Sequence, residues 1–251
     1  MLTFDDGFYN NYGYVMPILS EYDAKAVISV VGSYTDEYSK SNIANMTYGY
    51  VRWSEVYDMF IDKRVEVGNH SYDFHSNNHG RNGSKRNSGE SEDTYKNIFV
   101  DDTQKAQDRF MTKTGFAPII YTYPFGAYSE ETTDMLKSMG FKMSLTCNEG
   151  INHITDADSL FMLKRYNRPS GISTAGIPHQ KDLIRINVIF LRIFSKKTYS
   201  RFRVFNLCRK RCNFTLSVLK NCRHKSSLCK TRHHTKSLIF ILFHPRRPLH
   251  I

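Results

Sequence analysis

Short apolar runs and helical stripes alternate along the first two-thirds of the chain. β-Branched and aromatic runs predict strands at residues 26–31, 65–67, 119–123, 142–147 and 161–166. Apolar side chains at helical spacing predict helices at residues 15–22, 53–61, 102–112 and 129–139. Strands that alternate with helices are typical of a parallel sheet, either open or closed into a barrel. In such folds, the residues that carry chemistry lie at the C-terminal ends of the strands.

Turn residues and one polar stretch separate these elements. Gly32 and Gly68 each end a predicted strand, and Gly140 ends the last predicted helix. Ser129 is expected to cap that helix at its beginning. Residues 77–93 are rich in Asn, Ser and Gly, which predicts a long exposed loop without core residues.

Charge is divided unevenly along the 251 residues, whose net charge is +11. Residues 1–182 hold all 24 carboxylates and 18 Lys and Arg, whereas residues 183–251 hold 17 Lys and Arg and no carboxylate. The second stretch also lacks glycine, and it holds four of the five cysteines and five of the ten histidines. We therefore predict a folded domain over residues 1–175 and a basic tail over residues 176–251.

Three interpretations of the basic tail remain open. A nucleic-acid-binding or membrane-surface arm would explain its charge. A zinc module would explain its cysteines, although the Cys-x3-Cys-x9-Cys-x6-Cys spacing lacks the paired ligands of structural zinc sites. Translation outside the evolved reading frame would explain the missing glycine and carboxylates together, and such a tail would be disordered. The composition favours this third interpretation.

Membrane and secretion signals are missing from the pattern. No apolar run reaches the roughly 18 residues that cross a bilayer, and the longest near the end, Leu238–Phe243, has six. The first residues, Met1–Asp6, do not resemble the apolar part of a signal peptide. Cys147 lies in a predicted strand, where we expect a small buried side chain rather than a nucleophile.

The first cluster that could carry chemistry is Thr3–Gly7, with the adjacent carboxylates Asp5 and Asp6. Adjacent side chains point in different directions where a strand ends, so one carboxylate can bind a cation while the other stays free as a base. Gly7 permits a sharp turn there. The same three residues, Asp-Asp-Gly, also occur in ordinary turns.

The second cluster, Gly68–His75, follows the predicted strand at residues 65–67 and places His70 and His75 five residues apart. Two imidazoles and a carboxylate oxygen form a ligand set of catalytic zinc sites. The alternative is a pair of unrelated loop histidines. His79 could substitute as a ligand, although its polar loop predicts exposure to solvent.

The third cluster has the sequence YTYPFGAY from residue 121. Pro124 and Gly126 predict a tight turn that leaves the N–H groups of Phe125 and Gly126 available to an oxyanion. Aromatic side chains such as Tyr123 and Tyr128 could line a sugar-binding groove, or they could pack on the core.

Together and in this order, TFDDG, GNHSYDFH and YPFGAY resemble the successive motifs of the polysaccharide deacetylases, the NodB-homology or carbohydrate esterase family 4 group. The resemblance runs from Thr3 to about Ser173. The histidine spacing and the YPFG sequence look most like the branch that acts on poly-β-1,6-N-acetylglucosamine. Many members of the family instead space the histidines by four.

The resemblance implies an α/β fold, a distorted (β/α)7 barrel that we expect to be truncated at both ends. It implies that Asp6, His70 and His75 hold a divalent metal, with zinc preferred and cobalt, nickel or iron as alternatives. It also implies that Asp5 is the general base and that the Phe125 N–H donates to the oxyanion. The implied substrate-binding residues are Tyr123, Pro124, Gly126 and Tyr128.

Two departures from the family pattern bear on activity. The third motif contains no Arg to orient the catalytic Asp. Many members have a late Leu-x-His whose His is the general acid, whereas this chain has Leu163-Lys164-Arg165. His153 lies outside that pattern and is expected at the surface.

From these observations we expect a bacterial, metal-dependent N-deacetylase of N-acetylglucosamine residues in a cell-wall or exopolysaccharide polymer. We expect a monomer outside the cell or at its surface. One rival is an inactive family member that binds carbohydrate without turnover. A second rival is a basic nucleic-acid-binding protein, which would bind DNA with a steep salt dependence through residues 183–251.

Overall fold

The computed structural model describes residues 1–40, 47–76, 80–168, 236–238 and 240–243. The strands are β1 (Leu2–Phe4), β2 (Ala26–Val30), β3 (Val65–Asn69), β4 (Ile120–Thr122), β5 (Met143–Leu145), β6 (Asn152–Ile154), β7 (Arg165–Asn167), β8 (Lys236–Leu238) and β9 (Phe240–Phe243). The α-helices are α1 (Met16–Glu21), α2 (Gly32–Tyr38), α3 (Trp53–Ile61), α4 (Glu92–Thr114) and α5 (Thr132–Ser138). A π-helical segment (Asn11–Val15) precedes α1, and 3-10 turns occur at Pro124–Gly126 and Asp158–Leu160.

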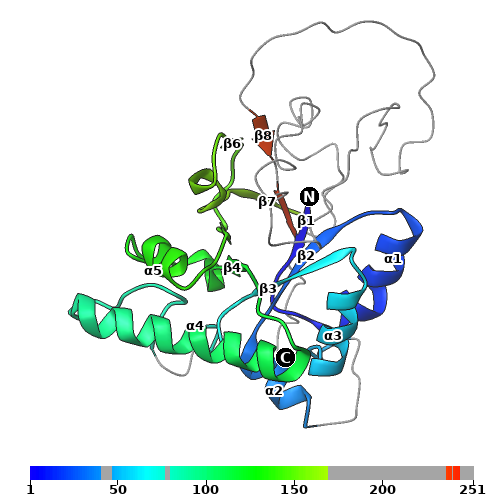
Figure 1. The fold of residues 1–251 in the computed structure, drawn as a ribbon, viewed down its shortest axis with the longest axis horizontal. Helices are drawn as coiled ribbons and strands as arrows, with labels where there is room; N and C mark the ends of the chain where they lie inside the picture. The colour runs from blue at the N-terminus through cyan, green and yellow to red at the C-terminus, as the bar shows by residue number, and fades with distance from the viewer. Residues whose placement is uncertain (41–46, 77–79, 169–235, 239, 244–251) are drawn as a thin grey trace, which may run out of the picture.

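Seven strands form a parallel sheet in the order β5-β4-β3-β2-β1-β9-β7. The sheet curls, and a parallel bridge joins Leu145 at one edge to Leu163, just before the strand at the other edge. Figure 1 shows α4 running beneath the strands with α3 beside it, while β6 and β8 lie at the opposite end. This arrangement confirms the predicted fold class, a distorted barrel of parallel strands.

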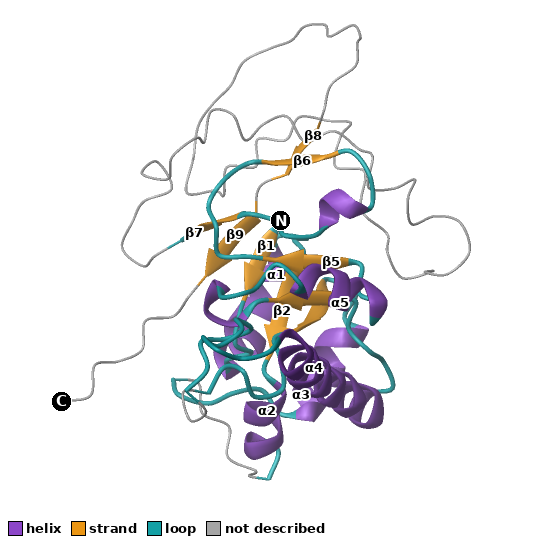
Figure 2. Cartoon of the chain, turned by 90° about the vertical axis from the view of Figure 1, so that its left-hand side faces the viewer, coloured by secondary structure: helices purple, strands orange, loops and turns teal. Residues whose placement is uncertain are grey.

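Alternate residues of β2 pack in two different cores. Ile28 and Val30 of β2 pack in a buried cluster with Val67 of β3 and Val56 of α3, between the sheet and its helices. Val27, between them in sequence, instead packs with other buried side chains inside the curl, including Ile120, Leu145 and Leu163. Figure 2 shows α2, α3 and α4 together on one side of the sheet. The two-residue period of the strands therefore supplies both layers.

Two short strands come from the predicted basic tail. β9 pairs in parallel with β1 on one side and with β7 on the other. β8 pairs antiparallel with β6. The four tail cysteines lie outside the described residues, as does the predicted boundary at residues 175–176. The three interpretations of the tail therefore stay predictions.

Element boundaries differ from the expected ones mainly at α4. Its helix begins at Glu92, ten residues before the expected start, because the Ser91 side chain caps the N–H of Thr94. Buried residues recur along the helix at Tyr95, Phe99, Thr103, Ala106, Phe110 and Thr114. The polar composition of its first turns hid this stripe, so the predicted loop at residues 77–93 is too long.

Smaller corrections concern the ends of other elements. The last predicted helix begins at Thr132, whose N–H bonds to the carbonyl oxygen of Ser129, so Ser129 is a turn residue rather than the cap. Of the expected strand at residues 161–166, only its end is part of β7. The helix at Trp53–Ile61 is confirmed at both ends. Within the described residues, no helix combines the length and the apolarity that a membrane span requires.

Candidate metal centre and active site

The first motif turns sharply where β1 ends. Asp6 and Gly7 both adopt left-handed backbone conformations, with φ of 72° and 70°. Such a conformation is costly for a residue with a Cβ atom and occurs mainly where the surrounding structure enforces it. A Cβ atom on Gly7 would lie 3.2 Å from the side chain of Val30, so glycine also suits the close packing there. The turn separates the side chains of Asp5 and Asp6, as the sequence predicted.

The second motif forms a loop that α4 holds in place. His70 directly follows β3, and Ser71 is left-handed with φ of 68°. The carboxylate of Asp102 accepts hydrogen bonds from the N–H groups of Tyr72 and Asp73, at 2.9 and 2.8 Å. These bonds fix the turn that brings the second histidine back toward the first.

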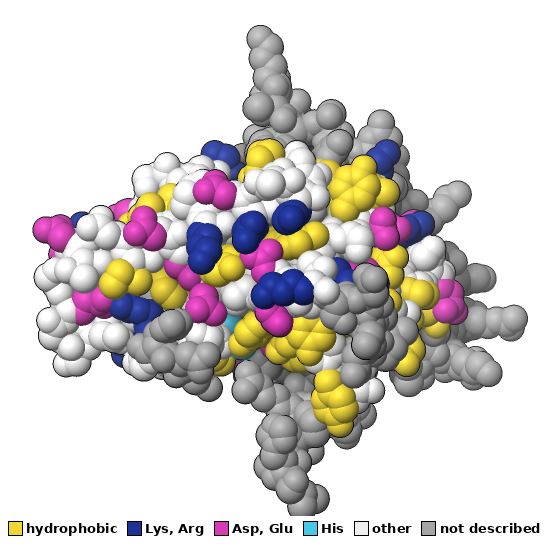
Figure 3. Space-filling model, turned by 90° about the horizontal axis from the view of Figure 1, so that it is seen from below, with side chains coloured by type: hydrophobic (Ala, Val, Ile, Leu, Met, Phe, Trp, Pro, Cys, Tyr) yellow, Lys and Arg dark blue, Asp and Glu magenta, His cyan; other side chains and the backbone are white. Residues whose placement is uncertain are grey.

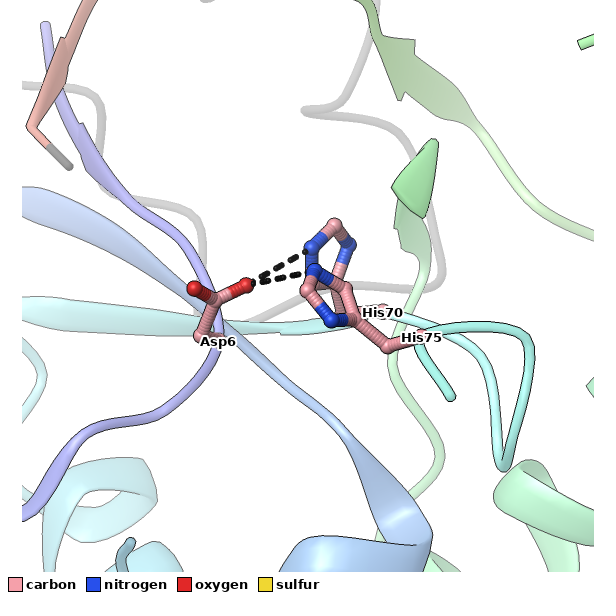
Figure 4. A group of neighbouring side chains, drawn as sticks. All are labelled: Asp6, His70 and His75. Carbon is pink, nitrogen blue, oxygen red and sulfur yellow. Dashed lines mark ion pairs between the residues drawn. The ribbon is translucent and has the colours of Figure 1, made fainter. Parts of the chain in front are cut away.

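Asp6, His70 and His75 meet in a buried cluster. Their candidate ligand atoms all lie within 4.8 Å of one another. The Oδ1 atom of Asp6 lies 2.9 Å from Nε2 of His75 and 3.3 Å from Nε2 of His70, as Figure 4 shows. Asp6 Oδ1 and His70 Nε2 are buried, and neither has a well-aligned hydrogen bond within the described residues. Buried polar atoms without partners are costly, so this donor set fits a divalent cation.

A backbone carbonyl sets the orientation of His70. Its Nδ1 atom lies 2.7 Å from the carbonyl oxygen of Thr122, at the end of β4. A carbonyl oxygen only accepts hydrogen bonds, so Nδ1 carries the proton and the lone pair of neutral His70 is on Nε2. This is the usual outer support of a metal-ligating imidazole.

The electrostatics of the cluster favour a charged Asp6. Burial raises the pKa of Asp6, but the short contacts and charge interactions with the imidazoles of His70 and His75 outweigh it and lower the pKa far below its usual range. Burial lowers the pKa of His70, but interactions with the carboxylates of Asp6 and Asp5 outweigh this effect, so the pKa is raised above its usual value. The site is therefore an anionic carboxylate that attracts positive charge.

Arg165 of β7 holds Asp5. The guanidinium donates two hydrogen bonds to the carboxylate, from Nη1 to Oδ1 at 2.8 Å and from Nη2 to Oδ2 at 2.9 Å. It also donates to the carbonyl oxygen of Thr146 and to the hydroxyl of Thr3. Asp5 and Arg165 are 2% and 1% exposed. Burial raises the pKa of Asp5, but the charge and hydrogen bonds of Arg165 lower it to below its usual value.

The third motif reaches the cluster through Phe125. Its ring centroid lies 4.3 Å from that of His75, and its backbone is left-handed with φ of 56°. The Gly126 N–H donates to the carbonyl oxygen of Tyr123. The expectation that this N–H is available to an oxyanion is therefore wrong. The Tyr123 ring is fully buried, and Pro124 is buried as well. These two residues shape the turn from within, and their predicted contact with substrate stays a prediction.

Other candidate residues lie further from the cluster or face away. Tyr128 is half-buried and accepts a hydrogen bond from Asn148, so its predicted contact with substrate stays a prediction. His153 is exposed on β6, as expected. Cys147 is exposed just beyond β5, so the prediction of a buried strand residue is wrong. His79 lies outside the described residues.

Sequence reasoning missed the functions of Arg165 and Asp102. The absence of Arg from the third motif suggested that nothing orients Asp5, whereas β7 supplies Arg165 from 160 residues away. The only available signal was a lone Arg in a predicted strand. Asp102 gave no signal, because an acidic residue on a polar helix ordinarily faces solvent.

Comparison with known proteins relates this chain to one protein family. The family model for polysaccharide deacetylase matches residues 1–144, more than half of the chain. The poly-β-1,6-N-acetyl-D-glucosamine N-deacetylase of Escherichia coli (strain K12) is 24% identical over 192 residues, which cover 68% of this chain and 28% of that protein. The chain therefore spans just over a quarter of the length of this curated relative.

Solved structures agree on the fold. A de-N-acetylase from Aggregatibacter actinomycetemcomitans is 25% identical, with a TM-score of 0.54 and coverage of 66% of this chain and 68% of that one. The BpsB deacetylase domain from Bordetella bronchiseptica is 22% identical, with a TM-score of 0.53 and coverage of 65% and 70%. Both likenesses extend past the family match at residue 144.

Proposed function

The chain belongs to the polysaccharide deacetylase family, and on this premise we propose that it is a metal-dependent N-deacetylase. Its substrate would be the N-acetylglucosamine residues of a bacterial cell-wall or exopolysaccharide polymer. The name of the Escherichia coli relative supports a β-1,6-linked polymer. The observation that carries the proposal is the cluster of Asp6, His70 and His75 beside the Asp5–Arg165 pair.

The Asp5 carboxylate would act as the general base. Arg165 holds it ionised, so at neutral pH it is able to accept a proton from an attacking water. The bidentate contact also fixes the direction in which the carboxylate points. The N–H of Phe125 would donate to the oxyanion that forms on the substrate carbonyl.

Asp6, His70 and His75 would hold the cation. Three protein ligands are typical of catalytic zinc sites, whereas structural sites have four. When bound, a divalent cation supplies Lewis acidity, which polarises the amide carbonyl and lowers the pKa of a water molecule. We prefer zinc because the ligands are two imidazoles and a carboxylate, which also suit cobalt, nickel or iron. A polymer substrate of this kind supports a location outside the cell or at its surface.

The test is acetate release from β-1,6- and β-1,4-linked N-acetylglucosamine oligomers by the zinc-reconstituted chain. Asp5→Asn should lower kcat by about 10²–10⁴-fold, because it removes the base. His70→Ala should abolish both zinc binding and acetate release. His153→Ala is the matched control, since His153 is an exposed histidine on β6. It should behave as the wild type does.

The outcomes separate the proposal from its rival. Acetate release that is lost in both site variants and kept in the control supports a deacetylase. Stoichiometric zinc bound through His70 without acetate release from either linkage would overturn the deacetylase. The chain would then be an inactive, carbohydrate-binding family member, in line with Arg165 standing where many members have a catalytic His.

A further inference from the structure

A row of aromatic rings leads away from the metal cluster. The Tyr34 ring centroid lies 6.0 Å from that of His75, and the Tyr50 ring lies 4.5 Å further along. The Phe8 ring stacks on Tyr50, with centroids 4.8 Å apart and planes 22° from parallel. Phe125 lies on His75 itself, so aromatic rings adjoin the cluster on more than one side. We call Phe8, Tyr34 and Tyr50 the aromatic row.

The backbone builds this row onto the first motif. Phe8 and Tyr50 form an antiparallel bridge. On either side of it, the N–H of Tyr9 donates to Gly49 and the N–H of Val51 donates to Gly7, at 2.7 and 2.9 Å. The chain that leaves the catalytic carboxylates is therefore paired with the segment before α3. This pairing fixes Tyr50 over Phe8.

The end of the row nearest the metal cluster is tied to the second motif. The Tyr34 hydroxyl donates a hydrogen bond to the carbonyl oxygen of His75, at 2.9 Å. The row thus joins two of the three motifs through a helix, α2, and a loop that belong to neither.

The row lies outside the buried clusters of the fold. Phe8, Tyr34 and Tyr50 are each partly exposed, and none belongs to the three clusters of core residues. The neighbouring Phe125 and Tyr48 are 42% and 56% exposed. On the face seen in Figure 3, hydrophobic side chains gather beside a small exposed patch of histidine. Partly exposed aromatic rings beside a few converging polar groups are a common feature of ligand-binding sites.

We propose that the aromatic row binds the sugar residue next to the one that is deacetylated. This inference rests on the proposed function and adds a second binding position to it. A pyranose ring presents apolar C–H groups on its faces and hydroxyls on its rim, which match aromatic faces and phenolic hydroxyls. The row suits a neighbouring residue because Tyr50 and Phe8 lie one and two rings beyond Tyr34, the ring that adjoins His75.

The test compares substrate lengths in the zinc-reconstituted full chain. Tyr50→Leu and Phe8→Leu keep apolar volume but remove the ring. In each, the advantage in kcat/KM of a pentasaccharide over a disaccharide should shrink about fivefold, which is the size of one lost aromatic contact. Tyr57→Leu is the matched control, because Tyr57 is an exposed aromatic residue on α3. It should keep the full length advantage.

A second measurement separates this inference from the proposed function. Pentasaccharide binding to the zinc-loaded Asp5→Asn variant should weaken about fivefold when Tyr50→Leu is added. This holds even if the wild type binds the sugar without releasing acetate, in which case only the proposed function fails. An unchanged length advantage in Tyr50→Leu and Phe8→Leu would overturn the inference. If kcat/KM also falls equally on both substrates, the row is a structural support for the His75 loop.

Discussion

The two halves of the site are built in different ways. The metal half, Asp6, His70 and His75, comes from the ends of β1 and β3 and from the loop after β3. The base half joins Asp5 at the end of β1 to Arg165 on β7, and the two residues are separated by 160 positions in the sequence. In the sheet, β9 lies between their two strands. The strands of the metal half, β1 and β3, are likewise separated by a single strand, β2, so the two halves differ in their separation along the sequence rather than across the sheet.

The two halves also differ in how their charges are balanced. The metal half brings three candidate ligand atoms within 4.8 Å of one another, and we propose that a bound cation balances them. The base half is already balanced, because the guanidinium of Arg165 matches the carboxylate of Asp5 bond for bond. The family match ends at residue 144, so it includes the metal half and leaves Arg165 outside.

Removing Arg165 should produce the largest effect, because it leaves Asp5 buried without its counter-charge. Arg165→Met is expected to lower the free energy of unfolding by about 3–5 kcal/mol. Chemical denaturation of the zinc-free chain measures this loss. Lys164→Met is the control, since Lys164 is its exposed neighbour. It should be within about 0.5 kcal/mol of the wild type.

Two further variants decide whether the halves are independent. Asp5→Asn combined with Arg165→Met removes both charges, so it should recover much of the stability that Arg165→Met loses. Arg165→Lys keeps the charge but not the bidentate contact, and it should fold while losing activity. Zinc affinity should stay near the wild-type value in Arg165→Lys. A large fall in zinc affinity would mean that the two halves act as one unit.

Much of the fold could be predicted because strands and helices leave periodic signals. The β-branched run at Ala26–Val30 and the stripe from Trp53 to Ile61 came out with nearly the observed bounds. The beginning of α4 did not, because its first turn is polar and a capping Ser91 in a polar stretch looks like a loop. Ile98, Phe99 and Val100 then follow one another directly instead of recurring at helical spacing. Burial against distant strands decides such a case, and a linear pattern does not contain it.

The residues of the site also divide into those that the sequence could predict and those that it could not. Asp5, Asp6, His70 and His75 stand in motifs whose residues are close in sequence, so the pattern alone marked them. Arg165 could not be assigned, because its partner is set by the strand order of the sheet rather than by spacing. For Tyr123 the sequence left two interpretations open, a sugar contact and packing on the core, and its fully buried ring favours packing on the core.

A smaller effect should follow from loosening the metal half through α4. In Asp102→Asn the side chain keeps one acceptor oxygen, so only one of the two N–H bonds from Tyr72 and Asp73 is retained. Outer supports of this kind are worth about 10–100-fold in metal affinity. Competition with a fluorescent chelator measures the zinc affinity. Asp101→Asn, an exposed neighbour on the same helix, should leave it unchanged.

The result also sharpens the comparison between the halves. If Asp102→Asn binds zinc more weakly but keeps the free energy of unfolding of the wild type, Asp102 positions the His70–His75 loop. A loss of stability with unchanged zinc affinity would instead make it an ordinary helix-to-loop contact.

Another carboxylate, the half-buried Glu66, shows what burial does where the described residues supply no partner such as Arg165. Glu66 lies on β3 opposite Val27, on the face that turns into the curl. Asp5 is buried on the same sheet, yet Arg165 lowers its pKa, whereas burial raises the pKa of Glu66 to about 7. The folded state therefore binds a proton at Glu66 more tightly than the unfolded state does. Stability from this group is complete at low pH and is lost as the pH rises through the interval between the unfolded value and about 7.

Glu66→Gln should accordingly stabilise the chain at pH 8 by roughly 1–3 kcal/mol, because the neutral amide avoids the cost of a buried charge. Near pH 4 the carboxyl of Glu66 is protonated in both states, so wild type and variant should have nearly equal free energies of unfolding. Urea denaturation at the two pH values measures the difference. Glu149→Gln, at an exposed position after β5, is the matched control and should show no such pH dependence. If Glu66→Gln is instead less stable than the wild type at pH 8, although the two are equal at pH 4, a cation accompanies Glu66. That cation would then compensate the buried charge of Glu66, as Arg165 compensates that of Asp5.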